Sequence, residues 1–292
     1  MTRTMHALLA VMVLLTLCSC QVEDLTGAFS KAVRHGESLS QASQDFTPEQ
    51  EYYLGRAVAA QILSRYPAIN NNAANAYLNK LGQALAMHST QPSTFAGYHF
   101  MLLDSDEVNA FAAPSGFIFV TRGMVALTSG ESEMAAVLAH EISHVQNRDA
   151  VDAIKASRRT AVFTQIGRES AGQYAPVVPG SELLSLFSDS VDDIVNTLVV
   201  NGYSRGQEYD ADAGGQQILI RAGYDPHALE NVLITMSKRV HSGSGGFGST
   251  HPAASDRLKK LHAADSSTLV TESAARIKRF NTALGRYSAS TR

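Results

Sequence analysis

Apolar residues recur at intervals of three and four in several parts of the chain, which is the period of a helix with one buried face. The first of these stretches has Thr47 as a cap, Pro48 at the first helical position and Gln50 where it completes a capping box, and Pro67 ends it. A second stretch follows the asparagines at 70–72, and its apolar residues keep the same spacing: Tyr77, Leu78, Leu81 and Leu85. The pattern therefore predicts two consecutive helices.

The segment from Gly97 to Leu127 has a different pattern. Its aromatic and β-branched residues gather in short clusters, which Asp, Asn, Pro and Gly interrupt. Strands are predicted near 98–103 and 117–121. Because these few strands stand together among helices and do not alternate with them, the predicted fold class is α+β, mostly helical, with a small antiparallel sheet.

Helical patterns resume after the predicted strands. One helix is predicted to open at Thr128 or Ser129, with Glu131 in its first turn, and to run through Arg148 or slightly beyond. A break at 174–181 precedes a further helical region at 182–224, and Asp225 and Pro226 start another at 225–240. A glycine-serine loop at 242–250 then leads into a last one at 251–261.

The composition bounds the number of domains and the classes of binding partner. The chain has 292 residues and is 45% hydrophobic, enough for one large domain or two small ones with a substantial core. Its net charge is −3, and it carries no block of lysine or arginine. These charges give no electrostatic basis for binding nucleic acid or for strong attraction to anionic lipid.

The first residues have the order of an export signal. Arg3 lies in a short basic start, an apolar run extends from Ala7 to Leu17, and small residues and cysteine follow. The run is shorter than the roughly 20 apolar residues that a membrane-spanning helix needs. We therefore expect residues 1–19 to be removed as a signal peptide.

The segment Leu17–Cys20 is similar to the lipobox of bacterial lipoproteins, in which the signal is cleaved before a cysteine that is then acylated. Cys20 fits this role better than Cys18, which would place bulky Leu17 directly before the cut. The alternative is an ordinary signal peptide with two incidental cysteines. Residues 20–46 are polar and are predicted to form a lipidated tether. No cysteine follows Cys20, so no internal disulfide is expected.

The stretch "AAVLAHEISHVQNR" carries the first candidate chemistry. On a helix, His140 and His144 lie one turn apart on the same face and present two imidazoles to one point, where they can bind zinc. Glu141 is rotated by about 100°, beside the metal, where it can take a proton from a water on the metal. A helix with incidental surface histidines is the alternative, but nearly all the neighbouring residues are apolar.

A catalytic zinc ion usually keeps three protein ligands and one open position. The stretch "SRGQEYDADAGG" places Glu208 and Asp212 four residues apart on one helix face. One of them can bind zinc while the other orients a ligand histidine. The alternatives are a solvated acidic face and another divalent ion that accepts imidazole and carboxylate.

Several motifs in this order resemble those of a known family. The histidine motif "HEISH" is followed by "SRGQEYDAD", "AGYDP" and "THPAASDR", and "NAFAAPSGFIFVTRGMV" precedes it. The sequence from about Thr47 to His262 is similar to the HtpX-like and prenyl-protease-like gluzincin metallopeptidases, metallopeptidase family forty-eight. The lipobox favours its soluble, lipid-anchored periplasmic members. The resemblance implies a zincin-like metallopeptidase domain over residues 47–292.

The resemblance also implies roles for individual residues. His140, His144 and Glu208 would bind one zinc ion per subunit, Glu141 would act as general base and acid, and Asp212 would orient a ligand. An edge strand beside the metal would pair with an extended substrate. Its residues would be Gly116, Phe117, Ile118, Phe119 and Val120, for which an ordinary core strand is the alternative.

His251 stands before Pro252 at the end of the glycine-serine loop, where a histidine ordinarily only precedes a helix. The resemblance places it near the active site. There it would either donate to an oxyanion or occupy the open position of zinc in a resting state. The glycines of the loop leave the backbone few steric limits, so we expect it to move.

These expectations combine into a zinc metalloendopeptidase that faces the periplasm and cuts unfolded or misassembled envelope proteins. Gln21 after Cys20 resembles an outer-membrane address in lipoproteins. The competing hypothesis is a zinc-stabilised chaperone or assembly factor that binds clients and rarely cleaves. A pure binder has no need of a carboxylate next to the first ligand, so Glu141 favours the enzyme. The sequence leaves the oligomeric state open.

Overall fold

The computed structural model describes residues 45–170, 191–192, 194–239, 251, 253–261 and 270–288. The predicted signal peptide, Cys20, most of the tether, the break at 174–181 and the loop at 242–250 lie outside the described residues. The chain forms two compact units: Phe46–Ile154 with Val178–Arg292, and Met1–Asp45 with Lys155–Val177. No helix in the described ranges has the length and apolar character needed to cross a membrane.

The larger unit holds most of the secondary structure. Its helices are α2 (Pro48–Arg65), α3 (Asn72–Ala86), α4 (Arg122–Leu127), α5 (Glu131–Asn147), α8 (Arg205–Arg221), α9 (Ala228–Arg239), α11 (Ala254–Lys260) and α12 (Ala274–Ser288). Its strands are β1 (His99–Leu103), β2 (Ala110–Ala113) and β3 (Phe117–Thr121), with a 3₁₀ turn η1 (Pro114–Gly116) and a π-helical turn η2 (Thr197–Asn201). Helix α6 (Asp149–Ser170) begins in this unit and continues into the other. The α+β, mostly helical fold class is confirmed.

The predicted helix caps are largely confirmed. Thr47 and Gln50 form the capping box of α2, with Pro48 in its first turn. The side chain of Asn71 caps α3. Sequence reasoning gave no helix at α4 or α12, and it did not mark the start of α8, where the side chains of Ser204 and Gln207 form a second capping box.

The sheet is mixed, so the prediction of an antiparallel sheet is wrong. The strand order is β1-β3-β2, with β1 parallel and β2 antiparallel to β3. Strands β1 and β3 match the predicted ones, whereas β2 was missed because "AFAA" is short and alanine-rich. A tight turn with positive φ at Ser115 and Gly116 reverses the chain from β2 into β3, which therefore runs in the direction of β1.

The two outer edges of this sheet differ. On β1, helix α3 supplies hydrogen bonds from two side chains: Asn79 bonds the N–H and C=O of Phe100, and Asn75 accepts from the N–H of Leu102. These amides take the place of a neighbouring strand. The opposite edge belongs to β2, which contacts α5.

The prediction that Gly116–Val120 forms the edge strand is wrong. Residues Phe117–Val120 pair with β1 on one side and with β2 on the other, so β3 is the central strand. Gly116 belongs to the turn before it. The strand that contacts α5 and has an outer edge is β2. Its antiparallel pairing with β3 is continued by a hydrogen bond from the N–H of Thr121 to the C=O of Asn109.

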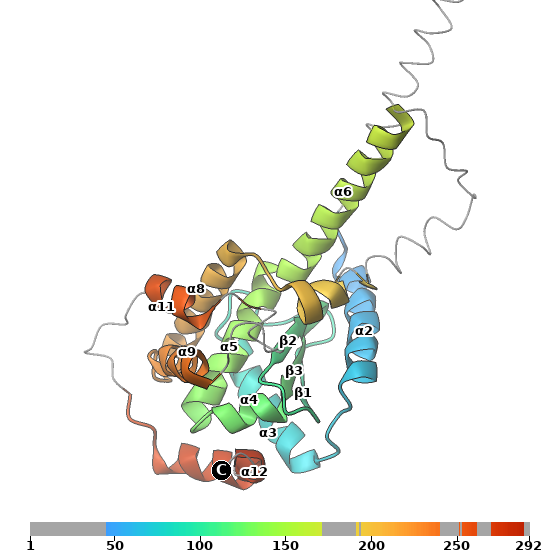
Figure 1. Ribbon diagram of the computed structural model, residues 1–292. Coiled ribbons are helices and arrows are strands. Elements are labelled where there is room, and N and C mark those ends of the chain that lie inside the picture. The colour runs from blue at the N-terminus through green and yellow to red at the C-terminus, as the bar shows by residue number, and fades with distance from the viewer. Residues whose placement is uncertain are drawn as a thin grey trace, which may run out of the picture. The chain divides into compact units, whose positions relative to one another are not determined.

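Helix α5 lies at the centre of the larger unit (Figure 1), between α8 and α9 on one side and the strands on the other. It is buried almost along its full length. Its cap is Gly130, not Thr128 or Ser129 as predicted, because Glu272 from far along the chain accepts from the N–H of Ser132 at 2.7 Å. A side chain at position 130 would collide with Glu272.

The first residue of α5 is also held by distant parts of the chain. Glu131 is buried, and its carboxylate accepts hydrogen bonds from the hydroxyls of Tyr77 and Tyr224 and pairs with Arg279 of α12. These bonds fix the N-terminal end of α5 between α3 and α12.

Helices α5 and α8 approach each other closely through two glycines of α8. A Cβ at Gly215 would lie 3.1 Å from the backbone nitrogen of His140, and one at Gly214 would collide with the Ser143 hydroxyl. The small residues therefore let α8 pack directly on the turn of α5 that carries the first histidine.

The close approach gives a first prediction. Gly215→Ala should lower the free energy of unfolding by about 1–3 kcal/mol, because the added methyl meets backbone that cannot move aside. The matched control is Gly206→Ala on the same helix, where the nearest atom to a new Cβ is the Ser204 hydroxyl at 4.0 Å. This control should gain up to about 1 kcal/mol. Urea denaturation measures both, and equal effects would contradict the close-packing argument.

Candidate metal centre

The two histidines of α5 meet as the sequence predicts. Their Nε2 atoms lie 3.1 Å apart, and both side chains are buried. Two ligands of one tetrahedral zinc ion are roughly 3.4 Å apart when each bond is about 2.1 Å long. The spacing of the two imidazoles therefore fits one ion.

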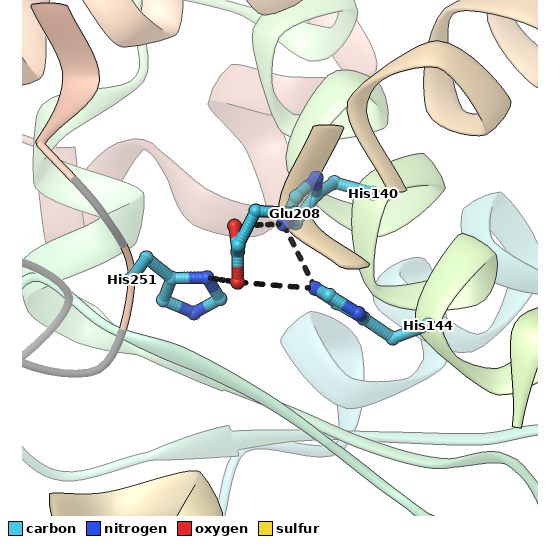
Figure 2. Close-up of side chains that lie close together, drawn as sticks. All are labelled: His140, His144, Glu208 and His251. Atoms are coloured by element: carbon cyan, nitrogen blue, oxygen red, sulfur yellow. Dashed lines mark hydrogen bonds and ion pairs between the residues drawn. The ribbon is translucent and has the colours of Figure 1, made fainter. Parts of the chain in front are cut away.

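Helix α8 brings a carboxylate to the same point. Glu208 is fully buried, with its oxygens 3.5 Å from Nε2 of His140 and 3.6 Å from Nε2 of His144. Nδ1 of His251 lies 2.6 Å from the Oε1 atom of Glu208. The four side chains converge in Figure 2, and one donor atom from each falls within 4.8 Å of the others.

Carboxylates behind the imidazoles orient both rings. Nδ1 of His140 lies 3.0 Å from Asp212, and Nδ1 of His144 lies 2.7 Å from Asp149. Each Nδ1 then carries the hydrogen, which turns the Nε2 lone pairs toward each other. Two such lone pairs need a positive charge between them, and a divalent metal ion satisfies this need.

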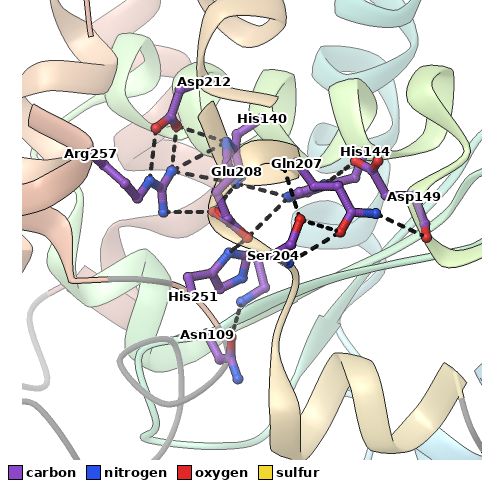
Figure 3. A network of polar contacts seen from close by, with 11 residues as sticks. Asn109, His140, His144, Asp149, Ser204, Gln207, Glu208, Asp212, His251 and Arg257 are labelled. Carbon is purple, nitrogen blue, oxygen red and sulfur yellow. Dashed lines mark hydrogen bonds and ion pairs between the residues drawn. The ribbon is translucent and has the colours of Figure 1, made fainter. Parts of the chain in front are cut away.

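A buried arginine completes the network (Figure 3). The guanidinium of Arg257 donates to both oxygens of Asp212, and its Nη1 lies 3.3 Å from Glu208. Arg257 thus fixes the carboxylate that orients His140. It comes from α11, directly after His251, so one short segment supplies both groups.

The electrostatics of the cluster favour a cation. Burial opposes ionisation of Glu208, but the neighbouring His251 and Arg257 and the hydrogen bonds to His140 and His251 outweigh it and hold the pKa of Glu208 well below its usual range. Burial likewise opposes ionisation of Asp212, and Arg257 lowers its pKa. Burial and Arg257 lower the pKa of His140, yet bonds to Asp212 and Glu208 raise it to about 9. The site therefore stabilises positive charge where the two imidazoles meet.

The pKa of His251 shifts in the opposite direction from that of His140. Burial lowers its pKa to about 4, although the nearby carboxylate of Glu208 acts in the opposite direction. A neutral imidazole has a lone pair available for a metal. The position and the neutral form of His251 both suit a ligand.

Glu141 occupies the next position on α5 and faces a small pocket. It is buried, its Oε1 has no hydrogen-bond partner in the described chain, and burial raises its pKa. The pocket is lined by residues of β2, η2 and the site: Ala110, Phe111, Ala112, Glu141, Thr197, Leu198, Tyr203 and His251. A buried carboxylate with an unused oxygen beside a group of candidate metal ligands can accept a proton there.

Comparison with known proteins identifies the family. The model of peptidase family M48 matches residues 72–265. The chain belongs to peptidase family M48.

Three relatives show how far the likeness extends. A beta-barrel assembly-enhancing protease of Yersinia pestis is 32% identical over 72% of this chain and 43% of its own length. The mitochondrial metalloendopeptidase OMA1 of Schizosaccharomyces pombe is 28% identical over 52% of this chain and 42% of its own. A protease HtpX homolog of Polynucleobacter necessarius is 28% identical over 55% of this chain and 65% of its own. The chain spans less than half the length of the first of these relatives.

The M48 resemblance predicted from the motifs is thus confirmed. The structure brings together the six residues that the sequence predicts for the metal site: His140, Glu141, His144, Glu208, Asp212 and His251. The predicted substrate strand at Gly116–Val120 does not line the pocket.

Sequence reasoning missed three residues of this M48 site. Arg257 lies within the quoted "THPAASDR" motif, which was the only available signal. Asp149 follows Arg148, whose positive φ ends α5 and turns the chain back toward His144. Tyr203 precedes the cap of α8 and stacks on His144, with ring centroids 4.3 Å apart.

Proposed function

We propose that this protein is a zinc-dependent metalloendopeptidase. The observation that carries the proposal is the buried carboxylate of Glu141, whose free oxygen faces the pocket beside the cluster of His140, His144 and Glu208. These three side chains would hold a zinc ion, which would supply the Lewis acidity that activates water near neutral pH and polarises a carbonyl. Membership of a peptidase family and relatives with protease names support the same activity.

Each residue of the site has a step in this mechanism. Glu141 takes a proton from the attacking water and passes it to the leaving amide nitrogen. Asp212 and Asp149 hold the rings of His140 and His144 with Nε2 toward the metal. Arg257 keeps Asp212 ionised and in place. The low exposure of all these groups excludes bulk water, which strengthens their electrostatic effect.

The edge of β2 is the proposed place for the substrate backbone. The N–H of Thr121 donates to the C=O of Asn109, so these two residues form a hydrogen-bonded pair of the antiparallel ladder. Such pairs alternate with non-hydrogen-bonded ones, and Ala112 falls opposite Ile118 in a non-hydrogen-bonded pair. The N–H and C=O of Ala112 therefore point away from β3. Ala112 lines the pocket that also holds Glu141. An extended peptide that adds to this edge would bring its carbonyl to the metal.

The substrates that we propose are unfolded or misassembled proteins of the cell envelope. An extended peptide is the form that strand addition requires, and only unfolded segments offer it. Relatives named beta-barrel assembly-enhancing protease support an envelope role. The lipobox supports a periplasmic location, with an anchor on Cys20 to the outer membrane. Mass spectrometry that finds unmodified Cys20 in the membrane fraction would contradict the anchor.

Mutants distinguish the proposed zinc ligands from the proposed general base. His140→Ala, His144→Ala or Glu208→Ala should reduce bound zinc and abolish casein cleavage, because each removes a ligand. Glu141→Gln should abolish cleavage with zinc retained, since an amide cannot take the proton. Metal analysis and a digestion assay measure the two effects. Full zinc and full activity in Glu208→Ala would refute the ligand set, and an inactive wild type would favour the chaperone hypothesis.

Strand addition at β2 predicts that one backbone N–H is needed for cleavage. Ala112→Pro removes the outward N–H, which an edge strand tolerates, so cleavage should fall at least tenfold with zinc and the melting temperature nearly unchanged. Ala112→Gly keeps the N–H and serves as the control. Peptide kinetics together with thermal melting give the comparison, and unchanged kinetics in Ala112→Pro would exclude this edge.

His251 is proposed to act as a resting-state latch. Its place beside Glu208 within the ligand cluster supports this role over that of an oxyanion donor. His251→Ala should retain zinc and cleave unfolded substrate faster, because no imidazole from position 251 would then compete with water and substrate at the site. Exposed His88, mutated to alanine, is the control. A zinc-replete mutant that is slower by about a hundredfold would instead establish the oxyanion role.

A further inference from the structure

Tyr203 is a buried aromatic residue for which the mechanism above has no use. It lies just before Ser204, the cap of α8, and only 9% of its surface is exposed. Its ring stacks on the ring of His144 at an interplanar angle of 27°. The same side chain lines the pocket that holds Glu141 and the edge of β2.

The hydroxyl of Tyr203 is buried and has no hydrogen-bond partner among the described residues. Other tyrosines in the larger unit do have one. The hydroxyls of Tyr77 and Tyr224 donate to Glu131, and that of Tyr98 donates to the carbonyl of Gln91. A buried polar group without a partner is costly to the fold, and phenylalanine would fill the same space without this cost. The hydroxyl therefore suits a partner that is not part of the protein.

The pocket thus contains two buried polar atoms without partners, the Oε1 of Glu141 and the hydroxyl of Tyr203. They do not bond each other, although one accepts and the other donates. Glu141 meets the attacking water in the proposed mechanism, so its free oxygen is explained. Tyr203 needs an oxygen acceptor, and a peptide that lies along β2 brings carbonyl oxygens into the pocket.

The surroundings of Tyr203 hold its phenol in place, because the side chain is buried and its ring stacks on His144. The side chain has few rotatable bonds, and its ring is held against the ring of His144. The hydroxyl is therefore positioned before the substrate arrives.

We propose that Tyr203 is a further catalytic residue, whose hydroxyl donates a hydrogen bond to the carbonyl oxygen of the scissile peptide as negative charge develops on it. The proposal rests on the peptidase activity proposed above and adds a residue to it. It also fits the latch role of His251, because a histidine within the ligand cluster at rest leaves the oxyanion to another donor.

Tyr203→Phe tests the proposal, since it keeps the stacked ring and removes only the hydroxyl. We expect kcat to fall by about a hundredfold or more, with KM changed little, because the bond strengthens in the transition state. Bound zinc should be unchanged, and the melting temperature should stay the same or rise. Tyr98→Phe is the matched control, and it should lower the melting temperature and leave kcat unchanged.

A second readout does not depend on turnover. A phosphinic peptide with small apolar side chains presents a tetrahedral centre with an oxygen in the position of the oxyanion. It should bind zinc-loaded Tyr203→Phe at least tenfold more weakly than wild type, by calorimetry. This measurement remains valid if wild type cleaves nothing, an outcome that would refute the proposed function and not the hydrogen bond.

Two outcomes would overturn the role of Tyr203. In the first, Tyr203→Phe cleaves at the wild-type rate and binds the phosphinic peptide equally well. In the second, the variant loses zinc or melts at a lower temperature, which would assign the hydroxyl a structural role.

Discussion

The contact between α5 and α8 is the constraint on which the metal centre depends. One helix carries both histidines and the other carries the acidic ligand, and a shift of either helix by part of a turn would separate them. Gly214 and Gly215 set the distance, because α8 rests on the backbone around His140 with no side chain between. Further anchors at the ends of α5, such as Glu131 and Arg148, serve to keep this helix in register.

Charge balance explains why so many ionisable groups remain buried together. Three carboxylates, Asp149, Glu208 and Asp212, contact imidazoles of the site, and a single guanidinium from Arg257 opposes them among the described groups. The carboxylates thus outnumber the guanidinium, and this excess of negative charge favours a bound cation. Buried charges on this scale destabilise a fold unless they are paired. A metal ion held here would therefore stabilise this core as well as take part in the chemistry.

Local patterns were sufficient to find most of the helices, though not α4 or α12, and the candidate ligands that lie on them. Spacing by four residues puts His140 with His144, and Glu208 with Asp212, on common faces, and this geometry needs no tertiary information. The capping box of α2 likewise acts within a few residues. These parts of the structure could be predicted because their causes are local.

Other features depend on residues far apart in the chain, and the sequence alone could not reveal them. Strand β2 is too rich in alanine to be recognised, and it exists because β3 and α5 cover it. Arg257 and Tyr203 acquire their roles only when α11 and the start of α8 reach the histidines. The side chain that accepts from the first turn of α5 is Glu272, which is 140 residues away from its partner Ser132.

The two asparagines of α3 have a consequence for self-association. With Asn75 and Asn79 bonded along β1, that side of the sheet offers no template for another strand, and β2 is the remaining one in the described chain. Copies of this protein that joined edge to edge would end as pairs and would not extend into fibrils.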